Sequence, residues 1–242
     1  MDTIKINKNG VKMVAHRGLS GLERENTYPA FIAAANRSYF AIECDIHKTA
    51  DGEFVVIHDE TTDRVSGGKY NIDVEKSAYE TFKDIILPDL DGKFDRKDIK
   101  IPLLVDYIKI CKKYNKVCVL EIKKPFSKQD LTRVVKIIEN EDYINQVIFI
   151  SFSFNNCLHL RDIGENLKIQ WLVGKDATDK HIQTLKEKHI DTDIRYTVLT
   201  KEIVDYLHDL GLEVNCWTCD SVTDAERLVE MGVDYITTNI LE

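Results

Sequence analysis

Three carboxylates are the first candidates for chemistry. Glu43 and Asp45 lie two residues apart in Phe40–Ile46, an apolar run typical of a β-strand, so both side chains point to the same side of it. Glu121 lies near the end of a second such run, Val117–Ile122. If these strands enclose a common interior, the three carboxylates converge there and repel one another unless a cation lies among them. Oxygen-only ligands favour a hard cation, so the pattern predicts one Mg²⁺ or Ca²⁺.

Two basic residues lie close to these groups in the sequence. Arg17 follows His16, and Lys123 comes two residues after Glu121. Salt bridges from these cations to the carboxylates are the alternative to a metal site. The same cations would also bind an anionic substrate group, since a guanidinium can hold two oxygens at once.

Two histidines complete the set. His16 ends the apolar run Val11–Ala15, and His58 follows Phe54–Ile57. A hairpin turn centred on Asp51-Gly52 would place position 58 opposite position 45, beside the proposed metal. Two imidazoles near a cation can act as general base and general acid near neutral pH. Together with the basic residues, this set suits phosphodiester chemistry better than aldol or redox chemistry.

Alternating apolar runs and amphipathic segments position these residues. Strands are expected at 11–15, 40–46, 117–122, 147–152, 169–173, 191–195, 212–217 and 234–238, with helices between them. The strand at 54–57 is too close to the second strand for a parallel crossover, so it folds back antiparallel. The remaining eight strands predict a (β/α)8 TIM barrel, an α/β fold, with an open doubly wound sheet as the alternative. Reactive groups then lie at the carboxyl ends of the strands.

The domain organisation follows from the same reading. We expect residues 1–242 to form one catalytic domain with an insertion at about 60–101, after the hairpin. The insertion is too long for an ordinary loop, so we expect it to have a small structure of its own and to be placed to cover the active-site end of the barrel.

Composition excludes several classes of protein. The chain has 242 residues with 33 Lys and Arg against 41 Asp and Glu, a net charge of −8, which argues against a nucleic-acid partner. No run is apolar enough to span a membrane, and the amino-terminal segment has no signal core. The six scattered cysteines are expected to be buried free thiols in a reducing cytoplasm. The oligomeric state has no signature in the sequence.

The order of these motifs resembles the glycerophosphodiester phosphodiesterase family. The resemblance extends from Val11 to about Thr238 and rests on V-A-H-R-G, E-N-T-Y-P-A-F, E-C-D-I-H-K-T-A-D-G-E-F-V-V-I-H-D, L-E-I-K and W-T. It implies a (β/α)8 barrel that hydrolyses deacylated phospholipids, which are small-molecule glycerophosphodiesters, to sn-glycerol 3-phosphate and an alcohol. In related phosphatidylinositol phospholipases a substrate hydroxyl attacks first and gives a cyclic phosphate, and the resemblance implies a similar route here.

The resemblance also implies the roles of individual residues. It makes Glu43, Asp45 and Glu121 the metal ligands and His16 and His58 the acid/base pair. Arg17 and Lys123 would hold the phosphate, and the glycerol would pack against Trp217.

The chain departs from the family pattern at three places. The usual W-T-V-N reads W-T-C-D at 217–220, the usual I-T-D reads Thr237-Thr238-Asn239, and Arg24 replaces a frequent proline. These changes bear on substrate choice, so a phospholipase that acts on intact lipid is an alternative on the same barrel. A barrel without activity is a third reading, although every proposed catalytic position is filled.

Four further residues receive structural interpretations. We expect His47 to be a solvated hairpin residue and Thr27 to cap the first helix. Cys216 and Cys219 are expected to pack in the core, because no second cysteine pair completes a zinc site.

Overall fold

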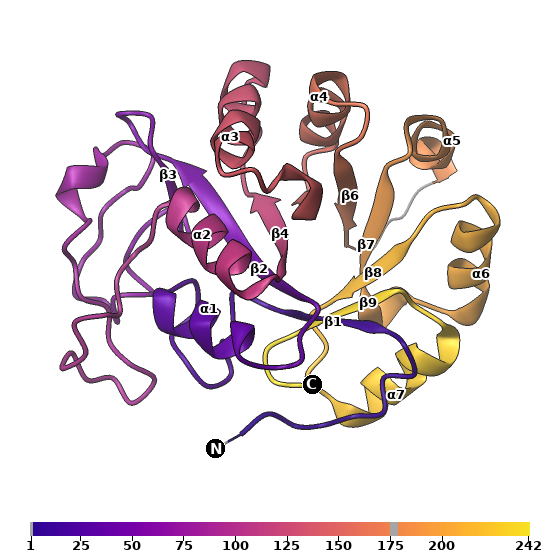
Figure 1. Ribbon diagram of the computed structural model, residues 1–242, viewed down its shortest axis with the longest axis horizontal. Helices are drawn as coiled ribbons and strands as arrows, with labels where there is room; N and C mark the ends of the chain where they lie inside the picture. Colours follow the sequence, from indigo (N-terminus) through magenta and orange to yellow (C-terminus); the bar gives the residue numbers. More distant parts are fainter. Residues whose placement is uncertain (1, 175–178) are drawn as a thin grey trace.

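Eight parallel strands form a closed barrel. The computed structural model describes residues 2–174 and 179–242. The sheet runs in the order β1-β9-β8-β7-β6-β5-β4-β2-β3, and a further pairing of β1 with β2 closes it (Figure 1). The parallel strands are β1 (Lys12–Ala15), β2 (Ala41–Lys48), β4 (Val117–Ile122), β5 (Val147–Ser151), β6 (Lys168–Val173), β7 (Asp191–Arg195), β8 (Val214–Trp217) and β9 (Tyr235–Thr238). The predicted TIM barrel is therefore confirmed, and the open sheet is excluded.

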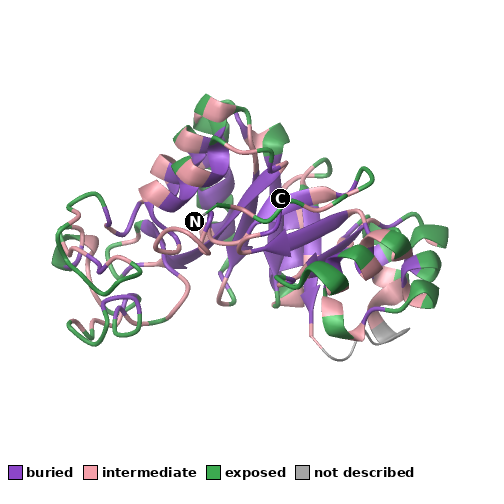
Figure 2. Ribbon diagram, turned by 90° about the horizontal axis from the view of Figure 1, so that it is seen from below, coloured by how far each residue is buried: buried purple, intermediate pink, exposed green. Residues whose placement is uncertain are grey.

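Helices connect the parallel strands and cover the outside of the barrel. They are α1 (Tyr28–Ala35), α2 (Leu104–Tyr114), α3 (Lys128–Asn140), α4 (Phe154–Ile163), α5 (Asp179–Lys188), α6 (Lys201–Asp209) and α7 (Val222–Met231). Alternate residues of each strand pack outward into the main apolar core, as Met13 and Ala15 of β1 do. The intervening residues, such as Val14 and Val119, form a smaller apolar cluster inside the barrel. Figure 2 shows that the strands are the most buried part of the molecule.

The hairpin after β2 has a different register from the predicted one. β3 (Phe54–Val56) does pair antiparallel with β2, but Ile46 faces Val56, and the Ile57 amide donates to the Asp45 carbonyl at 3.1 Å. Asp45 is therefore opposite position 57, and the predicted pairing with His58 was wrong by one residue. The cause is a loop of three residues instead of two, closed by Thr49 and Glu53, with Gly52 at φ +89°. His58 lies beyond β3, where the chain leaves the sheet.

Residues 60–101 form a loop-rich insertion beside the barrel. Their only regular element within the described chain is a 3₁₀ turn (Tyr79–Thr81), and they pack around an apolar cluster that includes Val74, Phe82 and Ile99. Figure 1 shows the insertion as the purple and magenta loops that extend from the β3 side. The insertion thus packs around an apolar core of its own, with almost no regular secondary structure.

The insertion is held against the loop between β1 and α1. Arg24 donates to the carbonyl oxygens of Pro88 and Asp89 at 2.7 and 2.8 Å, and Arg96 forms an ion pair with Glu23 at 2.7 Å. The residue that replaces the usual proline is therefore a link to the insertion. This attachment places the insertion next to one side of the mouth of the barrel.

Three smaller expectations have mixed outcomes. Thr27 does precede α1 with extended backbone, but its hydroxyl donates to the Arg24 carbonyl at 2.5 Å and does not cap the helix. All six cysteines, including Cys216 and Cys219, are buried free thiols. Among the described helices, none has the length and apolar character needed to cross a membrane.

Candidate active site

A cavity of about 120 Å³ opens at the carboxyl ends of the strands. It is lined by His16, Arg17, Glu43, His58, Glu121, Lys123, Ile150, Phe152, Leu172, Asp193, Trp217, Thr218 and Thr237. Every residue that the sequence singled out for catalysis or binding is in this set except Asp45, which lies beside it, completely buried. The barrel therefore brings the predicted residues into one place.

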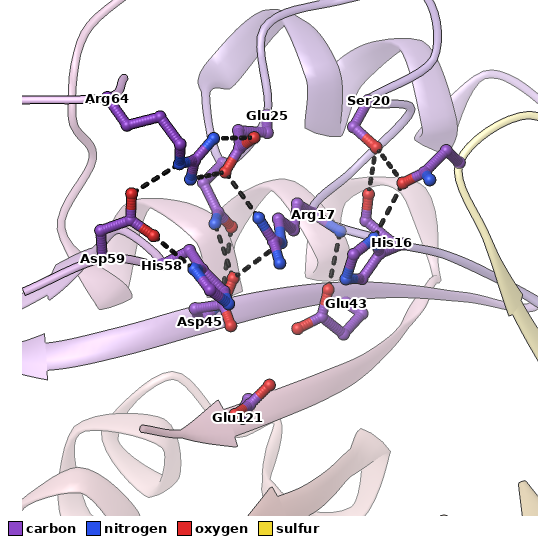
Figure 3. Close-up of polar contacts among 12 residues, drawn as sticks. His16, Arg17, Ser20, Glu25, Glu43, Asp45, His58, Asp59, Arg64 and Glu121 are labelled. Carbon is purple, nitrogen blue, oxygen red and sulfur yellow. Dashed lines mark hydrogen bonds and ion pairs between the residues drawn. The ribbon is translucent and has the colours of Figure 1, made fainter. Parts of the chain in front are cut away.

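The three carboxylates form one buried cluster. One oxygen each of Glu43, Asp45 and Glu121 lies within 4.8 Å of the others, and at most 8% of any of these residues is exposed (Figure 3). The register Asp45–Glu121 between the adjacent strands β2 and β4 sets this proximity. Glu43 and Asp45 both face the interior because side chains alternate along a strand, as the sequence predicted.

The charges in this cluster are unequal. Burial, with the nearby negative charges of Asp45 and Glu121, raises the pKa of Glu43 well above its usual range. Burial and the Asp45 charge also raise the pKa of Glu121 to about 7. Burial opposes ionisation of Asp45 too, but Lys123 and Arg17 outweigh it and hold the pKa of this carboxyl below its usual range. Asp45 thus carries the negative charge of the cluster most readily.

The two predicted cations do pair with these carboxylates. Lys123 Nζ lies 2.7 Å from Glu121 Oε1 and 3.4 Å from Asp45 Oδ1, and Arg17 Nε lies 3.3 Å from Asp45 Oδ2. Ion pairing, the alternative to a metal, is therefore present in part.

The pairs leave the carboxylates incompletely satisfied. Glu43 Oε1 accepts no hydrogen bond and is in no ion pair within residues 2–174 and 179–242, and the equally buried Asp45 Oδ1 and Glu121 Oε1 have their ion pairs with Lys123 but no hydrogen bond there. Buried oxygens without hydrogen bonds are costly, and a hard divalent cation would be ligated by all three. The donor set fits Mg²⁺ or Ca²⁺.

His16 is oriented from the far end of the chain. Its Nδ1 lies 2.8 Å from Asn239 Oδ1, which also accepts from Ser20 at 2.6 Å. Asn239 Nδ2 donates to Asp220 at 2.6 Å, and this contact fixes the amide with its oxygen towards His16. Nδ1 of His16 therefore carries the proton, and Nε2 has a free lone pair. Burial and the Arg17 charge lower the pKa of His16 to about 4, so the ring is neutral at pH 7.

His58 has a carboxylate partner instead. Its Nδ1 lies 2.6 Å from Asp59 Oδ1, and Asp59 in turn accepts from Arg64 at 2.5 Å (Figure 3). Burial lowers the pKa of His58, although the Asp45 and Asp59 charges oppose that shift. Asp59 also stabilises the imidazolium when the ring takes up a proton.

His47 supports His58 and is not solvated, contrary to the sequence interpretation. It is 1% exposed, its Nε2 lies 3.1 Å from the His58 carbonyl, and its Nδ1 lies 3.3 Å from Glu75. The prediction was wrong because β2 continues to Lys48, so His47 is still inside the sheet and the insertion covers it. It holds the backbone that carries His58.

A chain of ion pairs links the two sides of the site. Arg64 of the insertion binds Glu25 with both terminal nitrogens, at 2.7 and 2.8 Å, while its Nε binds Asp59. Glu25 also accepts from Arg17 at 2.8 Å. Burial opposes ionisation of Glu25, but Arg64 and Arg17 lower its pKa to about 2. Nothing in the sequence around Arg64 marks it as part of the site, because it comes from the insertion.

The loop after β1 is shaped by left-handed backbone. Arg17 has φ +55° and its amide donates to Glu43 Oε2 at 2.7 Å. Asn26 has φ +56° and its Nδ2 donates to Asp45 Oδ2 at 2.8 Å. Asn26 therefore both shapes this loop and holds a carboxylate of the cluster.

The other half of the cavity is mostly apolar. Ile150, Phe152, Leu172 and Trp217 come from β5 to β8 and the residues that follow them. The Trp217 and Phe152 rings pack edge to face with their centres 5.5 Å apart. The cavity therefore has a charged side from β1 to β4 and an apolar side from β5 to β8, which suits a ligand with an anionic part and a carbon-rich part.

One carboxylate on the apolar side was missed by sequence reasoning. Asp193 of β7 lines the cavity, is 1% exposed, and has a buried Oδ1 with no hydrogen-bond partner among the described residues. The signal that could have found it is the alternation that located Glu43 and Asp45: Ile194 points outward, so Asp193 points inward.

Comparisons with known proteins agree with one another. A family model described as "Glycerophosphoryl diester phosphodiesterase family" matches residues 16–242. A glycerophosphodiester phosphodiesterase of Caldanaerobacter subterraneus subsp. tengcongensis is 29% identical, over 94% of this chain and 93% of that protein. The lysophospholipase D GDPD1 of Homo sapiens is 25% identical, over 94% of this chain and 83% of that protein.

Solved structures share the fold. An Oleispira antarctica phosphodiesterase, determined in complex with the product sn-glycerol-3-phosphate, superposes with a TM-score of 0.81 at 19% identity, over 94% of this chain and 92% of that one. At this identity the likeness concerns the barrel alone.

Proposed function

The chain belongs to the glycerophosphoryl diester phosphodiesterase family, and from this membership we propose that it hydrolyses glycerophosphodiesters with one divalent cation to sn-glycerol 3-phosphate and an alcohol. It is an enzyme of the phosphoric diester hydrolase class. The observation that carries the proposal is the convergence, in one cavity, of two imidazoles, two basic side chains and three buried carboxylates. The proposal includes a cytoplasmic location, which the six buried free thiols support.

The charged side of the cavity would bind the phosphate. Glu43, Asp45 and Glu121 would hold Mg²⁺ or Ca²⁺, which supplies a positive charge that stabilises the negative charge on the phosphate oxygens. Arg17 and Lys123 line the cavity next to this cluster and would contact the same phosphate. The carbon part of the substrate then extends to the apolar side, where the glycerol packs against Trp217.

The two histidines would transfer the protons. His16 presents an unprotonated Nε2 and would take the proton from the attacking hydroxyl. His58, whose imidazolium is stabilised by Asp59, would give a proton to the oxygen of the leaving alcohol. The attacking group in the first step is the glycerol hydroxyl next to the phosphoester. Its oxygen bonds to phosphorus as the alcohol leaves, and water then opens the cyclic phosphate with the proton transfers reversed.

The test is release of glycerol 3-phosphate from glycerophosphocholine and glycerophosphoethanolamine. We expect release to stop in EDTA and to return when Mg²⁺ or Ca²⁺ is added. His16→Ala and His58→Ala should each lower kcat by at least about 100-fold with unchanged thermal unfolding. A His58→Ala enzyme with the wild-type rate would refute the mechanism, and release that persists in EDTA would refute the metal.

Acylated lipid is the second candidate substrate. The observation that favours it is Phe152, which is 48% exposed beside Trp217 at the mouth of the cavity. A lysophospholipase D among the relatives points the same way. Release of choline from lysophosphatidylcholine, or binding to anionic liposomes, would support this candidate over the deacylated substrates.

A further inference from the structure

Asp193 has a position that its role in the fold does not explain. On β7 its neighbours Thr192 and Ile194 face away from the barrel interior: Thr192 donates to the Glu213 carbonyl and Ile194 packs in the outer core. Asp193 therefore points into the barrel and reaches the wall of the cavity. Asp191, two residues earlier on the same face, accepts from the Glu213 amide at 2.9 Å and is thus satisfied by the fold itself.

The Asp193 carboxyl lacks such a partner. Its Oδ1 is buried and accepts no hydrogen bond from the part of the chain that the structure describes. The charge that acts on it is the negative charge of Glu121, and burial together with that charge raises the pKa of Asp193 well above its usual range. A core position would be filled more favourably by an apolar residue, so the carboxyl must be retained for a ligand in the cavity.

The surroundings of Asp193 indicate which part of a ligand it meets. The Trp217 indole contacts the Asp193 backbone, because Nε1 donates to the Asp193 carbonyl at 3.2 Å. Leu172 is its register neighbour on β6. Glycerol carbons can pack against such a surface, but a glycerol hydroxyl there needs a polar partner. Two threonines, Thr218 and Thr237, line the cavity here, and the Thr237 hydroxyl already donates to Asn215 at 3.3 Å.

We propose that Asp193 binds the terminal hydroxyl of the substrate's glycerol group and thereby selects deacylated glycerophosphodiesters over their acylated counterparts. The inference rests on the proposed function. The hydroxyl next to the phosphoester is the attacking group, so the terminal hydroxyl is the one left for the apolar side. A hydroxyl both donates and accepts, so the bond forms with either protonation state of the carboxyl. An ester at that carbon has no proton to donate and adds an acyl chain next to the buried Asp193 carboxyl.

The experiment compares three substrates: glycerophosphocholine, its 1-butanoyl ester, and the analogue that lacks the terminal hydroxyl, propane-1,2-diol 1-phosphocholine. Wild-type kcat/KM should be highest for glycerophosphocholine. Asp193→Leu should lower kcat/KM for that substrate by about 10- to 100-fold and leave the analogue unchanged, so the preference disappears. Asp193→Asn, which keeps a polar group of the same size, should retain an intermediate preference. Thr218→Val serves as the matched variant on the same side of the cavity.

The outcomes separate this inference from the proposed function. Hydrolysis of glycerophosphocholine by the wild type establishes the function first, and a wild type inactive on both glycerophosphocholine and glycerophosphoethanolamine refutes the function and the inference together. Equal losses on all three substrates in Asp193→Leu, or no loss on any, would overturn the role of Asp193 while the function stands. Selective loss in Thr218→Val alone would assign the hydroxyl to Thr218 instead. Thermal unfolding gives a second measure: Asp193→Leu should be at least as stable as the wild type, whereas a structural role predicts a lower midpoint.

Discussion

The two histidines of the cavity differ in what holds them. His58 is bound by the carboxylate of Asp59, whereas His16 is bound by the amide oxygen of Asn239, with the carboxylate of Asp220 one step further out. Positions 220 and 239 are two of the places where the chain departs from W-T-V-N and I-T-D. Relative to those two patterns, the amide and the carboxylate stand at each other's positions, and in this chain Asn239 Nδ2 donates to Asp220. The exchange moves a negative charge away from His16.

Reversing the exchange should therefore change the titration of His16. In the double variant Asp220→Asn/Asn239→Asp the carboxylate lies against His16 and favours the imidazolium, so its pKa should rise from about 4 by about one to two units. Since His16 must be neutral to act as base, the acidic limb of kcat/KM against pH should move to higher pH. NMR titration of His16 would measure the shift directly.

The single variant Asn239→Asp is the matched control. It places two carboxylates in contact, where Asn239 Nδ2 now lies 2.6 Å from Asp220, and should lower stability by about 1–3 kcal/mol. The double variant should recover most of that loss. Equal stability of the single and double variants, or an unchanged acidic limb, would contradict the exchange.

Among the elements, the insertion holds together the segments that carry the catalytic residues. Arg64 joins Asp59, which follows β3, to Glu25 in the loop between β1 and α1, and through Glu25 to Arg17. Figure 3 shows these residues in a row above Asp45. The insertion therefore affects the site by fixing the segment after β3 and the loop between β1 and α1.

Removing Arg64 should loosen both loops. Arg64→Ala should lower kcat by about 3- to 10-fold, because Asp59 then holds His58 less firmly; the half-exposed side chain limits the effect. Arg64→Lys should retain part of the activity. Lys100→Ala, which removes an ion pair with Asp84 within the insertion, is the control and should leave kcat unchanged. Steady-state kinetics on glycerophosphocholine measures all three, and equal kcat for Arg64→Ala and Lys100→Ala would contradict the role of Arg64.

The turn that follows β1 requires a glycine at position 18. Gly18 has φ +75°, and a Cβ there would lie 2.6 Å from the Ala30 carbonyl carbon in α1. Gly211 has a similar φ of +78° but nothing within 4 Å of a Cβ. Gly18→Ala should cost about 2–4 kcal/mol, from backbone strain and the clash together, and Gly211→Ala about 1 kcal/mol. Urea denaturation measures both, and equal losses would mean that α1 can move aside.

At the scale of the whole molecule, barrel closure forces like charges together. Glu43 and Glu121 bind protons more tightly in the folded chain than in the unfolded one, since their pKa values are raised. Stability from Glu121 is complete below its usual pKa near 4.5 and is lost as pH rises through its folded pKa of about 7, and Glu43 acts in the same direction. The metal-free protein should therefore lose on the order of 2 kcal/mol between pH 5 and 8, to which Asp191, with a pKa raised to about 6, also contributes.

Adding the cation should reverse this trend. Bound Mg²⁺ or Ca²⁺ needs ionised ligands, so the thermal midpoint should rise more on metal addition at pH 8 than at pH 6, and binding should release protons. Calorimetry in buffers of different ionisation enthalpy would count those protons. Glu121→Gln should flatten the pH dependence of the metal-free protein. A metal effect of the same size at both pH values would contradict the carboxylate site.

Much of the molecule was determined by local sequence. The eight parallel strands, the antiparallel hairpin strand and the inward direction of Glu43, Asp45 and Glu121 all follow from apolar periodicity, because strand alternation is a property of a few neighbouring residues. The gathering of the predicted site residues at one end of the barrel follows as well, since strand ends in a barrel meet at one edge.

Other features were decided only by the tertiary structure. The hairpin register depended on one residue of loop length, and the burial of His47 on how far β2 extends under the insertion. Arg64 reaches Glu25 across 39 residues, and Asn239 reaches His16 across 223, so both contacts exist only once the barrel has closed. Asp193 lies between the two cases: alternation gives its direction, but only the folded barrel shows that nothing in the described chain satisfies its carboxyl.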